Sequence, residues 1–377
     1  MSDLWDVAVI GAGPAGAMAA RSLAAEGARV ALIDKNAFPR FKVCGCCLNA
    51  DALATLNAAG LGSALAELGG EPLDQMIVVG EGQQATLGLP RGLAVSRAGL
   101  DHALVAAAVE RGACLRERTT ALGVEPTPAG YRLALRSDNA RSTLIARTML
   151  VADGLGGGFL RSMTGFRTQI EADSRIGMAT VVPAPGDDYP AGTIHMAWGR
   201  AGYCGLVRIE QDQLALAAAV EPAFIRRCGG PGAAAAHLIA DAGLPLPALD
   251  AARWKGTPQL SRRIEPRAVS GFYLTGDAAG YVEPFTGEGM AWALASGARF
   301  AAFAGGALAA GELPPPREWQ RLQRRFLDPR QRRCRWITRA LRQPMLARLA
   351  LACAARWPAL TGGLTRPVAA RVHDPLH

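Results

Sequence analysis

The 377-residue chain is half hydrophobic, has a net charge of +9 and eight cysteines, and lacks the roughly 20 uninterrupted apolar residues of a membrane-spanning helix. These properties exclude a disulfide-rich secreted domain and a helical membrane anchor, and they allow two or three packed domains. The first residues do not have the basic leader of a signal peptide, so we expect a cytoplasmic protein with reduced thiols.

Residues 6–35, DVAVIGAGPAGAMAARSLAAEGARVALIDK, predict a nucleotide-binding βαβ unit. The elements expected here are a strand over 6–10, a helix ending near residue 26 and a strand over 29–33. Gly11, Gly13 and Gly16 have the G-x-G-x-x-G spacing that permits a tight turn, the approach of a pyrophosphate and close helix–strand packing. The helix N-terminus offers N–H groups to phosphates. Asp34 is placed for a ribose hydroxyl, which favours FAD or NAD over NADP.

Three cysteines crowd the next loop, FPRFKVCGCCLNADAL. C-x-C-C is not a usual zinc-ligand spacing, and no second Cys/His pair is evident elsewhere. Three interpretations stay open. Cys44 and Cys46 form a strained redox disulfide; Cys46 is a reactive thiol whose pKa is lowered by Arg40 and Lys42; or Cys44 packs as a small hydrophobe while Cys46 and Cys47 shape a pocket.

Residues 271–297, GFYLTGDAAGYVEPFTGEGMAWALASG, predict a strand, a turn and a helix beginning near Met290. The stretch resembles the second FAD fingerprint of flavoproteins built like p-hydroxybenzoate hydroxylase, and most of all that of the geranylgeranyl reductase branch. This resemblance implies that Asp277 binds the ribityl chain. It also implies that the following helix points its N-terminus at the flavin, which stabilises the anionic reduced ring.

Four other segments are similar to the same family. Residues 39–48 match its P-R-x-K-x-C-G-x-x-L loop, which lies beside the isoalloxazine and reads G-E-S in flavin-dependent halogenases. Residues 95–113 resemble its R-x-x-L-D-x-x-L helix, and 119–125 the strand whose backbone meets the adenine. Residues 150–163 resemble its D-G motif, with a glycine (157 or 158) at the serine position.

The resemblance thus implies a set of FAD-binding residues: Gly11, Ala12, Gly13, Pro14, Ala15, Gly16, Asp34, Lys35, Arg40, Cys44, Gly45, Arg97, Leu122, Asp153, Gly276, Asp277, Pro284, Gly287, Gly289 and Met290. Cys46 and Cys47 are the catalytic candidates, and no metal is expected.

The middle of the chain contains short apolar runs separated by glycine and proline turns, which predict an antiparallel sheet. In the family, such a sheet covers the flavin and carries the substrate pocket. His195, Tyr203 and Arg208 are polar residues in it, but none is assigned as a general base. The halogenase W-x-W-x-I-P motif is absent, and GYCGLVRI stands where geranylgeranyl reductases have Y-x-W-x-F-P.

Residues 317–377 contain 14 arginines and three acidic residues, so this segment carries a charge of +11 and residues 1–316 carry −2. Its composition is helical, and Pro329, Pro344 and Pro358 are expected to divide it into short helices. Two interpretations stay open: basic amphipathic helices that contact a membrane surface, or a cap that packs on the body. No base-reading motif indicates nucleic acid, and the oligomeric state is left open.

The predicted fold is α/β. A Rossmann-like FAD-binding domain is formed by residues 1–75, 95–164 and 266–310, an inserted β-sheet substrate domain by 76–94 and 165–265, and a basic helical region by 311–377.

The predicted function is that of an FAD-dependent oxidoreductase. The resemblance favours a monooxygenase that uses NAD(P)H and a flavin C4a-hydroperoxide to hydroxylate a hydrophobic aromatic or polyketide-type substrate in a dry pocket. The alternatives are an FADH₂-dependent reductase of isoprenoid or enone double bonds, a flavin-dependent halogenase, and a flavin-binding scaffold or sensor.

Overall fold

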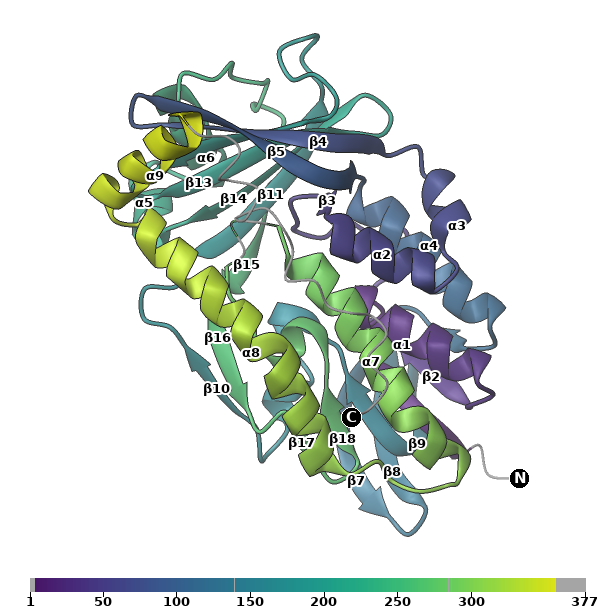
Figure 1. Cartoon of the computed structure of the whole chain (residues 1–377). Helices are drawn as coiled ribbons and strands as arrows, with labels where there is room; N and C mark the ends of the chain where they lie inside the picture. The colour runs from purple at the N-terminus through teal and green to yellow at the C-terminus, as the bar shows by residue number, and fades with distance from the viewer. Residues whose placement is uncertain (1–3, 139, 284, 286, 357–377) are drawn as a thin grey trace.

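The computed structural model describes residues 4–138, 140–283, 285 and 287–356, and it has two lobes joined by a long helix (Figure 1). The lower lobe is built on an eight-stranded sheet of order β17-β18-β9-β1-β2-β6, to which β8 and β7 are added beside β9. Its strands are β1 (Leu4–Ile10), β2 (Val30–Ile33), β6 (Cys114–Arg116), β7 (Thr119–Thr127), β8 (Gly130–Ser137), β9 (Ala140–Val151), β17 (Ala268–Val269) and β18 (Phe272–Leu274).

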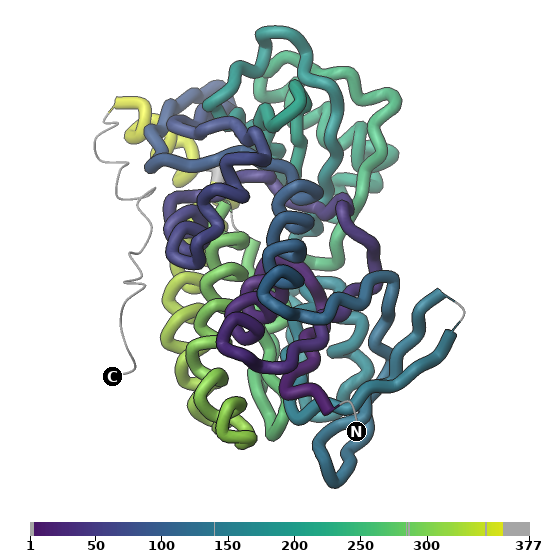
Figure 2. Tube along the Cα trace, turned by 90° about the vertical axis from the view of Figure 1, so that its right-hand side faces the viewer, coloured from purple at the N-terminus to yellow at the C-terminus, as the bar shows by residue number. Residues whose placement is uncertain are grey.

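The central strands of this sheet are parallel and end at one edge. Ile10 of β1 pairs with Ile33 of β2 and with Val151 of β9, and Leu274 of β18 pairs with the same Val151. The turns after these strands therefore meet, and in open parallel sheets ligands bind beyond this carboxyl edge. The hairpin of β7 and β8 projects away from the body, at the lower right of Figure 2.

Helices cover one face of this sheet. Side chains along its strands alternate between two faces, and both faces are buried. Val7 and Val9 of β1 belong to a core shared with the helices, whereas Ala8 and Ile10 face a second core that includes β8 and β9. The helices beside the sheet are α1 (Pro14–Ala25), α2 (Ala50–Ala58), α3 (Gly62–Ala66), α4 (Arg97–Glu110) and α7 (Gly289–Ala309). This arrangement confirms the predicted βαβ unit and the helix predicted to begin near Met290.

The upper lobe is a second eight-stranded sheet, of order β15-β11-β14-β13-β12-β4-β5-β3, in which only β12 and β4 pair in parallel within the described ranges. Its strands are β3 (Cys47–Leu48), β4 (Glu71–Gly80), β5 (Gln83–Ala94), β11 (Ile176–Pro183), β12 (Thr193–Gly199), β13 (Gly202–Ile209), β14 (Gln213–Val220) and β15 (Lys255–Gln259). Helices α5 (Pro222–Arg227) and α6 (Pro231–Asp241) accompany it. The predicted antiparallel sheet is confirmed. The domain division stays a prediction, and β4 crosses its boundary at 75/76.

Short elements link the lobes: strands β10 (Arg167–Ile170) and β16 (Arg262–Glu265), and 3-10 turns at Gly154–Gly156, Leu160–Ser162 and Gly276–Ala279.

Helix α8 (Pro316–Leu341) runs from the lower lobe to α9 (Pro344–Arg356), which lies against the upper sheet (Figure 1). The predicted helix break at Pro329 is wrong, because α8 continues through it. Packing offsets the lost backbone hydrogen bond: Phe326 and Leu327 are buried just before it, and Asp328 pairs with Arg267 at 2.7 Å. The break at Pro344 is confirmed, and Pro358 lies outside the described residues. In the ranges described, no helix is both long and apolar enough to cross a bilayer.

Candidate functional site

A cavity of about 960 Å³ extends from the carboxyl edge of the parallel sheet to the inner face of the upper sheet. Its first half is lined by glycine turns and charged residues of the lower lobe. Its second half is lined by aliphatic and aromatic residues of the upper sheet, α8 and α9. The two halves differ in the chemistry that they can bind.

The N-terminus of α1 opens into the first half of the cavity. Its N-cap, Gly13, has no side-chain cap, and a Cβ there would meet only the Arg40 guanidinium, at 3.8 Å. By contrast, a Cβ on Gly11 would lie 2.3 Å from the Ala152 carbonyl oxygen, and one on Gly16 would lie 1.9 Å from the Gly11 carbonyl oxygen. Gly11 and Gly16 are therefore required by packing, whereas Gly13 leaves open space where a pyrophosphate fits.

The Asp34 carboxylate lies at the end of β2 and is held by backbone donors. Its Oδ2 accepts a hydrogen bond from the Ala12 N–H at 3.0 Å, and its Oδ1 accepts one from the Asn36 N–H at 2.9 Å. Only 7% of its surface is exposed, and the residue lines the cavity. A fixed acceptor in this place fits a ribose hydroxyl.

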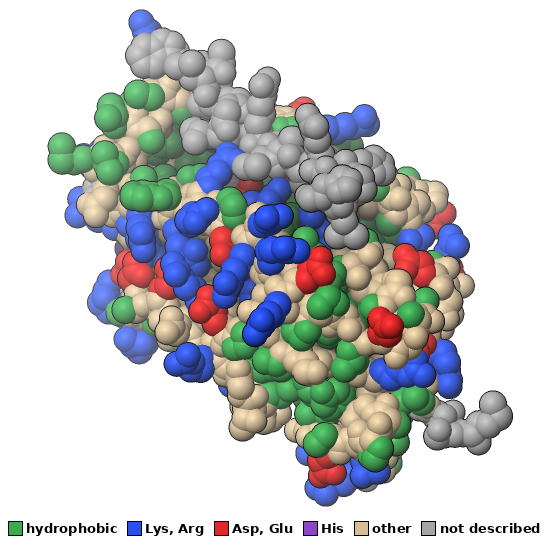
Figure 3. Space-filling model, turned by 60° about the horizontal axis from the view of Figure 1, so that its bottom comes forward, with side chains coloured by type: hydrophobic (Ala, Val, Ile, Leu, Met, Phe, Trp, Pro, Cys, Tyr) green, Lys and Arg blue, Asp and Glu red, His purple; other side chains and the backbone are tan. Residues whose placement is uncertain are grey.

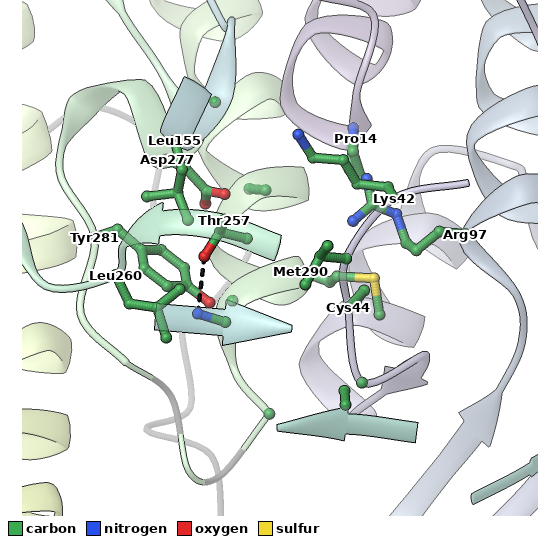
Figure 4. A pocket seen from close by; sticks show the side chains of 18 of the residues that line it. Pro14, Lys42, Cys44, Arg97, Leu155, Thr257, Leu260, Asp277, Tyr281 and Met290 are labelled. Atoms are coloured by element: carbon green, nitrogen blue, oxygen red, sulfur yellow. Dashed lines mark hydrogen bonds between the residues drawn. The ribbon is translucent and has the colours of Figure 1, made fainter. Parts of the chain in front are cut away.

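Three cations gather beside the glycine turn: Arg40, Lys42 and Arg97. Arg97 forms two 2.8 Å hydrogen bonds with Asp101, which also pairs with Arg40 at 3.1 Å. Burial, with the charges of Arg97 and Arg40, lowers the pKa of Lys42. In Figure 4, Lys42 and Arg97 lie on one wall and Asp277 on the other. Asp101 and Asp34 offset part of this positive charge, and the remaining charge together with the open helix N-terminus suits an anionic ligand.

Two acidic residues, Asp153 and Asp277, lie in the cavity wall. Asp153 accepts hydrogen bonds from the Phe159 and Leu160 N–H groups through Oδ2, while its buried Oδ1 has no partner. Burial raises the pKa of Asp277, and this effect is opposed by Lys42 and other nearby cations. A buried acceptor without a partner, such as Asp153 Oδ1, is rare unless a ligand supplies its donor. These features all fit a dinucleotide.

The second half of the cavity is apolar. Its lining includes Leu73, Met76, Val78, Leu87, Ile194, Met196, Val207, Leu260, Phe285, Ile337, Leu341 and Leu351. Tyr203 brings a polar group to this wall. Its side chain hydrogen-bonds to Glu283, which pairs with Arg175 at 3.1 Å. Burial, followed by the Glu283 charge, raises the pKa of Tyr203, so the phenol stays neutral.

A protein-family model described as an FAD binding domain, FAD_binding_3, matches residues 5–200, just over half of the chain. The chain belongs to this family. It is an FAD-binding protein, as the motifs predicted.

The relatives found among characterised proteins match it only in part. Conditioned medium factor receptor 1 of Dictyostelium discoideum is 28% identical over 331 residues, which is 80% of this chain but 63% of that protein. Menaquinone reductase of Mycobacterium tuberculosis is 48% identical over 67 residues, which is 18% of this chain and 16% of the reductase.

Solved flavoproteins share the fold at low identity. Flavin-dependent brominase Bmp2 has a TM-score of 0.79 at 19% identity and covers 96% of this chain and 92% of its own. p-Nitrophenol 4-monooxygenase PnpA of Pseudomonas putida has a TM-score of 0.76 at 14% identity, with 95% of each chain covered. A geranylgeranyl bacteriochlorophyll reductase-like protein of Thermoplasma acidophilum has a TM-score of 0.71 at 20% identity. The match covers 99% of this chain and 94% of that protein. These likenesses establish the fold and not the reaction.

Most of the residues predicted for FAD line the cavity: Gly11, Gly13, Pro14, Ala15, Asp34, Lys35, Arg40, Cys44, Gly45, Arg97, Leu122, Asp153, Gly276, Asp277, Gly287, Gly289 and Met290. Ala12 and Gly16 do not line it and act through the turn behind it. Pro284 lies outside the described residues. The binding roles themselves stay predictions.

The cysteine loop separates its three thiols. Cys47 lines the cavity beside Cys44, whereas Cys46 packs into the core of the upper lobe with a positive φ of 58°. The expectation that neighbouring cations lower the pKa of Cys46 is wrong, because burial, with the charges of Cys44 and Cys47, raises it. All eight cysteines are free thiols. Among the described residues, no three His, Cys, Asp or Glu side chains are grouped to hold a metal ion.

Sequence reasoning missed several lining residues. Lys42 was within the matched P-R-x-K-x-C-G motif, and Tyr281 within the second fingerprint, so a signal existed for both. The α8 and α9 side chains at this cavity had no such signal. Of the polar residues noted in the middle segment, Tyr203 lines the cavity. His195 and Arg208 do not, and Arg208 instead donates a hydrogen bond to the Tyr189 carbonyl.

Proposed function

We propose that this FAD-binding protein is an NAD(P)H-using monooxygenase that hydroxylates a hydrophobic aromatic or polyketide-type substrate. The observation that carries the proposal is the apolar second half of the cavity, which is continuous with the half that fits FAD. Aliphatic walls favour a ligand with a hydrophobic chain, and they exclude water. Exclusion of water suppresses the side reactions of oxygen-dependent flavin chemistry. The substrate lining comes from segments far apart in the chain, from Leu73 in β4 to Leu351 in α9.

The residues that would hold FAD divide by its parts. The open N-terminus of α1 at Gly13 would bind the pyrophosphate, Asp34 the ribose, and Asp277 the ribityl chain. Bound FAD would supply the redox chemistry, by taking two electrons from NAD(P)H and passing them to oxygen. The N-terminus of α7 at Gly289, which also lines the cavity, would offer its positive dipole to the flavin.

Tyr203 would orient the substrate. Because its hydroxyl donates to the Glu283 carboxylate, its oxygen keeps a lone pair for a donor on the substrate. A phenolic hydroxyl of the substrate could donate to that lone pair while its chain lies along the aliphatic wall. Arg175 compensates the buried Glu283 charge and holds this carboxylate in place. The Tyr203 oxygen, which would accept from the substrate, is therefore fixed before the substrate binds.

A reductase of isoprenoid or enone double bonds is the second candidate. The observation that favours it is the 48% identity with menaquinone reductase over 67 residues, which is 18% of this chain. An isoprenoid chain would fit the same apolar walls.

Rapid-mixing absorbance of the purified flavoprotein tests the proposal. The enzyme is reduced anaerobically and mixed with oxygen, with and without a long-chain alkylresorcinol. We expect a short-lived absorbance band distinct from reduced and oxidised flavin, and a product one oxygen atom heavier. Featureless reoxidation, together with anaerobic addition of two hydrogens to the side chain of an isoprenoid quinone, would replace the monooxygenase by the reductase. Protein that binds no FAD would overturn both.

A further inference from the structure

Helix α9 is apolar on two opposite sides, although it lies at the surface. Ala347 and Leu351 are buried against the upper lobe, with 1% and 6% of their surface exposed. Met345 and Leu349 are 84% and 62% exposed. Leu349 is two residues from both buried positions, a turn of about 200° around the helix, so it points away from them. A helix with apolar side chains all round is normally covered on every side.

Exposed apolar side chains are concentrated in this part of the molecule. Eight large hydrophobic residues are exposed in the described chain, and four of them lie within residues 336–349: Trp336, Met345, Leu346 and Leu349. We call these four side chains, with Arg339 and Arg356, the outer face. Single exposed hydrophobic residues are common, but a cluster of this kind marks an interaction surface.

The charge of the outer face is positive. Residues 336–356 contain four arginines and no acidic residue. Arg342 pairs with Glu283 and Asp173, and Arg348 pairs with Glu81, whereas the exposed Arg339 and Arg356 have no acidic partner in the described chain. Figure 3 shows basic side chains gathered beside protruding hydrophobic ones on this side of the molecule.

We propose that the outer face docks on an anionic phospholipid bilayer. Apolar side chains interleaved with arginines match the boundary between acyl chains and negatively charged headgroups. A second copy of the chain is a poorer match, because a symmetric contact would bring arginines against arginines. Residues 357–377 are also a poorer match for the basic outer face, since with two arginines and one acidic residue they carry a net positive charge themselves.

Docking would place the substrate cavity at the bilayer. Ala350, Leu351 and Ala354 of α9 line that cavity, and Ala350 is itself exposed, so the rim of the cavity lies at this helix. If the substrate is hydrophobic, which rests on the proposed function, it could pass from lipid into the cavity without crossing water. The docking itself does not depend on the reaction.

Vesicle flotation of the full-length, FAD-loaded protein tests the docking. We expect binding to vesicles of phosphatidylglycerol and phosphatidylcholine, and weak binding to phosphatidylcholine alone. A Met345→Glu/Leu349→Glu double variant should bind at least ~30-fold more weakly, and Arg339→Gln/Arg356→Gln about tenfold more weakly. Leu246→Glu is the matched control, because Leu246 is 56% exposed and lies outside these helices. It should bind like the wild type, and all variants should keep their FAD.

Three results would overturn the proposal. The first is a Met345→Glu/Leu349→Glu protein that binds anionic vesicles as tightly as Leu246→Glu. The second is a dimer in vesicle-free solution that this double substitution dissociates, which would make a second copy the occupant. The third concerns Cys353, an exposed thiol of α9. If it resists maleimide in the vesicle-free monomer while exposed Cys114 reacts, residues 357–377 cover the face. Reaction of both thiols, with vesicles protecting Cys353 alone, would support the proposal.

Discussion

The contact between α1 and α7 gives a sharp test of how this fold holds its cofactor site. Gly297 of α7 faces Ala15 in the first turn of α1, and a methyl group on Gly297 would lie 2.1 Å from the Ala15 carbonyl oxygen. The clash is with backbone, so no side chain can swing away. To reach an ordinary contact, the two helices must separate by about 1 Å, and overpacking of this kind costs ~1–3 kcal/mol. Alanine's better helix propensity returns up to ~1 kcal/mol.

Gly297→Ala should therefore lower the free energy of unfolding by about 1–2 kcal/mol. Because Ala15 also lines the cavity, beside Pro14, the shift should weaken FAD binding about tenfold, the equivalent of 1.4 kcal/mol. Urea denaturation followed by circular dichroism measures the first effect, and fluorescence titration of the deflavinated protein measures the second. Gly306→Ala is the matched control: it lies in the same helix and has no atom within 4 Å of its added methyl. If both variants are equally stable and bind FAD equally well, the packing argument is refuted.

Three further predictions concern single side chains. Asp34→Asn removes the charge that accepts the Ala12 N–H, and it should weaken FAD binding about tenfold or more in the same titration. Tyr203→Phe removes the donor to Glu283 and should raise the KM for the alkylresorcinol several-fold, with unchanged FAD affinity; an unchanged KM would mean that the phenol does not meet the substrate. Burial lowers the pKa of His195 below its usual 6.5. As the pH falls through 6.5, the unfolded chain therefore binds a proton at this residue that the folded chain does not bind. The free energy of unfolding decreases below that pH. His195→Gln should lose less of its urea midpoint between about pH 7.5 and 5.5 than the wild type does.

Features set by neighbouring residues could be predicted from the sequence. Gly11 has a φ of +102° and Gly16 packs on the Gly11 carbonyl, so this turn is set largely by neighbouring residues. Asp34 comes directly after the next strand, so 35 residues locate one end of the cavity. The state of Cys46 could not be predicted in this way. Its neighbours in sequence include cations, but the residue turns into the upper lobe, where burial decides its pKa.

The role of the C-terminal helices depended on contacts between distant segments. Leu351 reaches the cavity because α9 packs on β5, more than 250 residues earlier in the chain, and no local pattern encodes that pairing. The parallel pairing of β12 with β4 is hidden for the same reason, since a crossover between lobes leaves no periodicity in the sequence.

Of the two interpretations of the basic tail, the packed cap fits the ion pairs of α8, and membrane contact is the one that we propose for α9. Arg335 of α8 pairs with Glu171 at 2.7 Å, and Arg342, just after α8, pairs with Glu283, so part of the positive charge of the tail holds it to the body. The charge of +11 in the sequence therefore overstates what a membrane would meet. Docking through the outer face should then depend more on Met345 and Leu349 than on charge. Raising the salt from 0.1 to 0.5 M, which shortens the Debye length to under ~5 Å, should weaken vesicle binding without abolishing it. Complete release by salt would mean that arginines alone hold the protein on the bilayer.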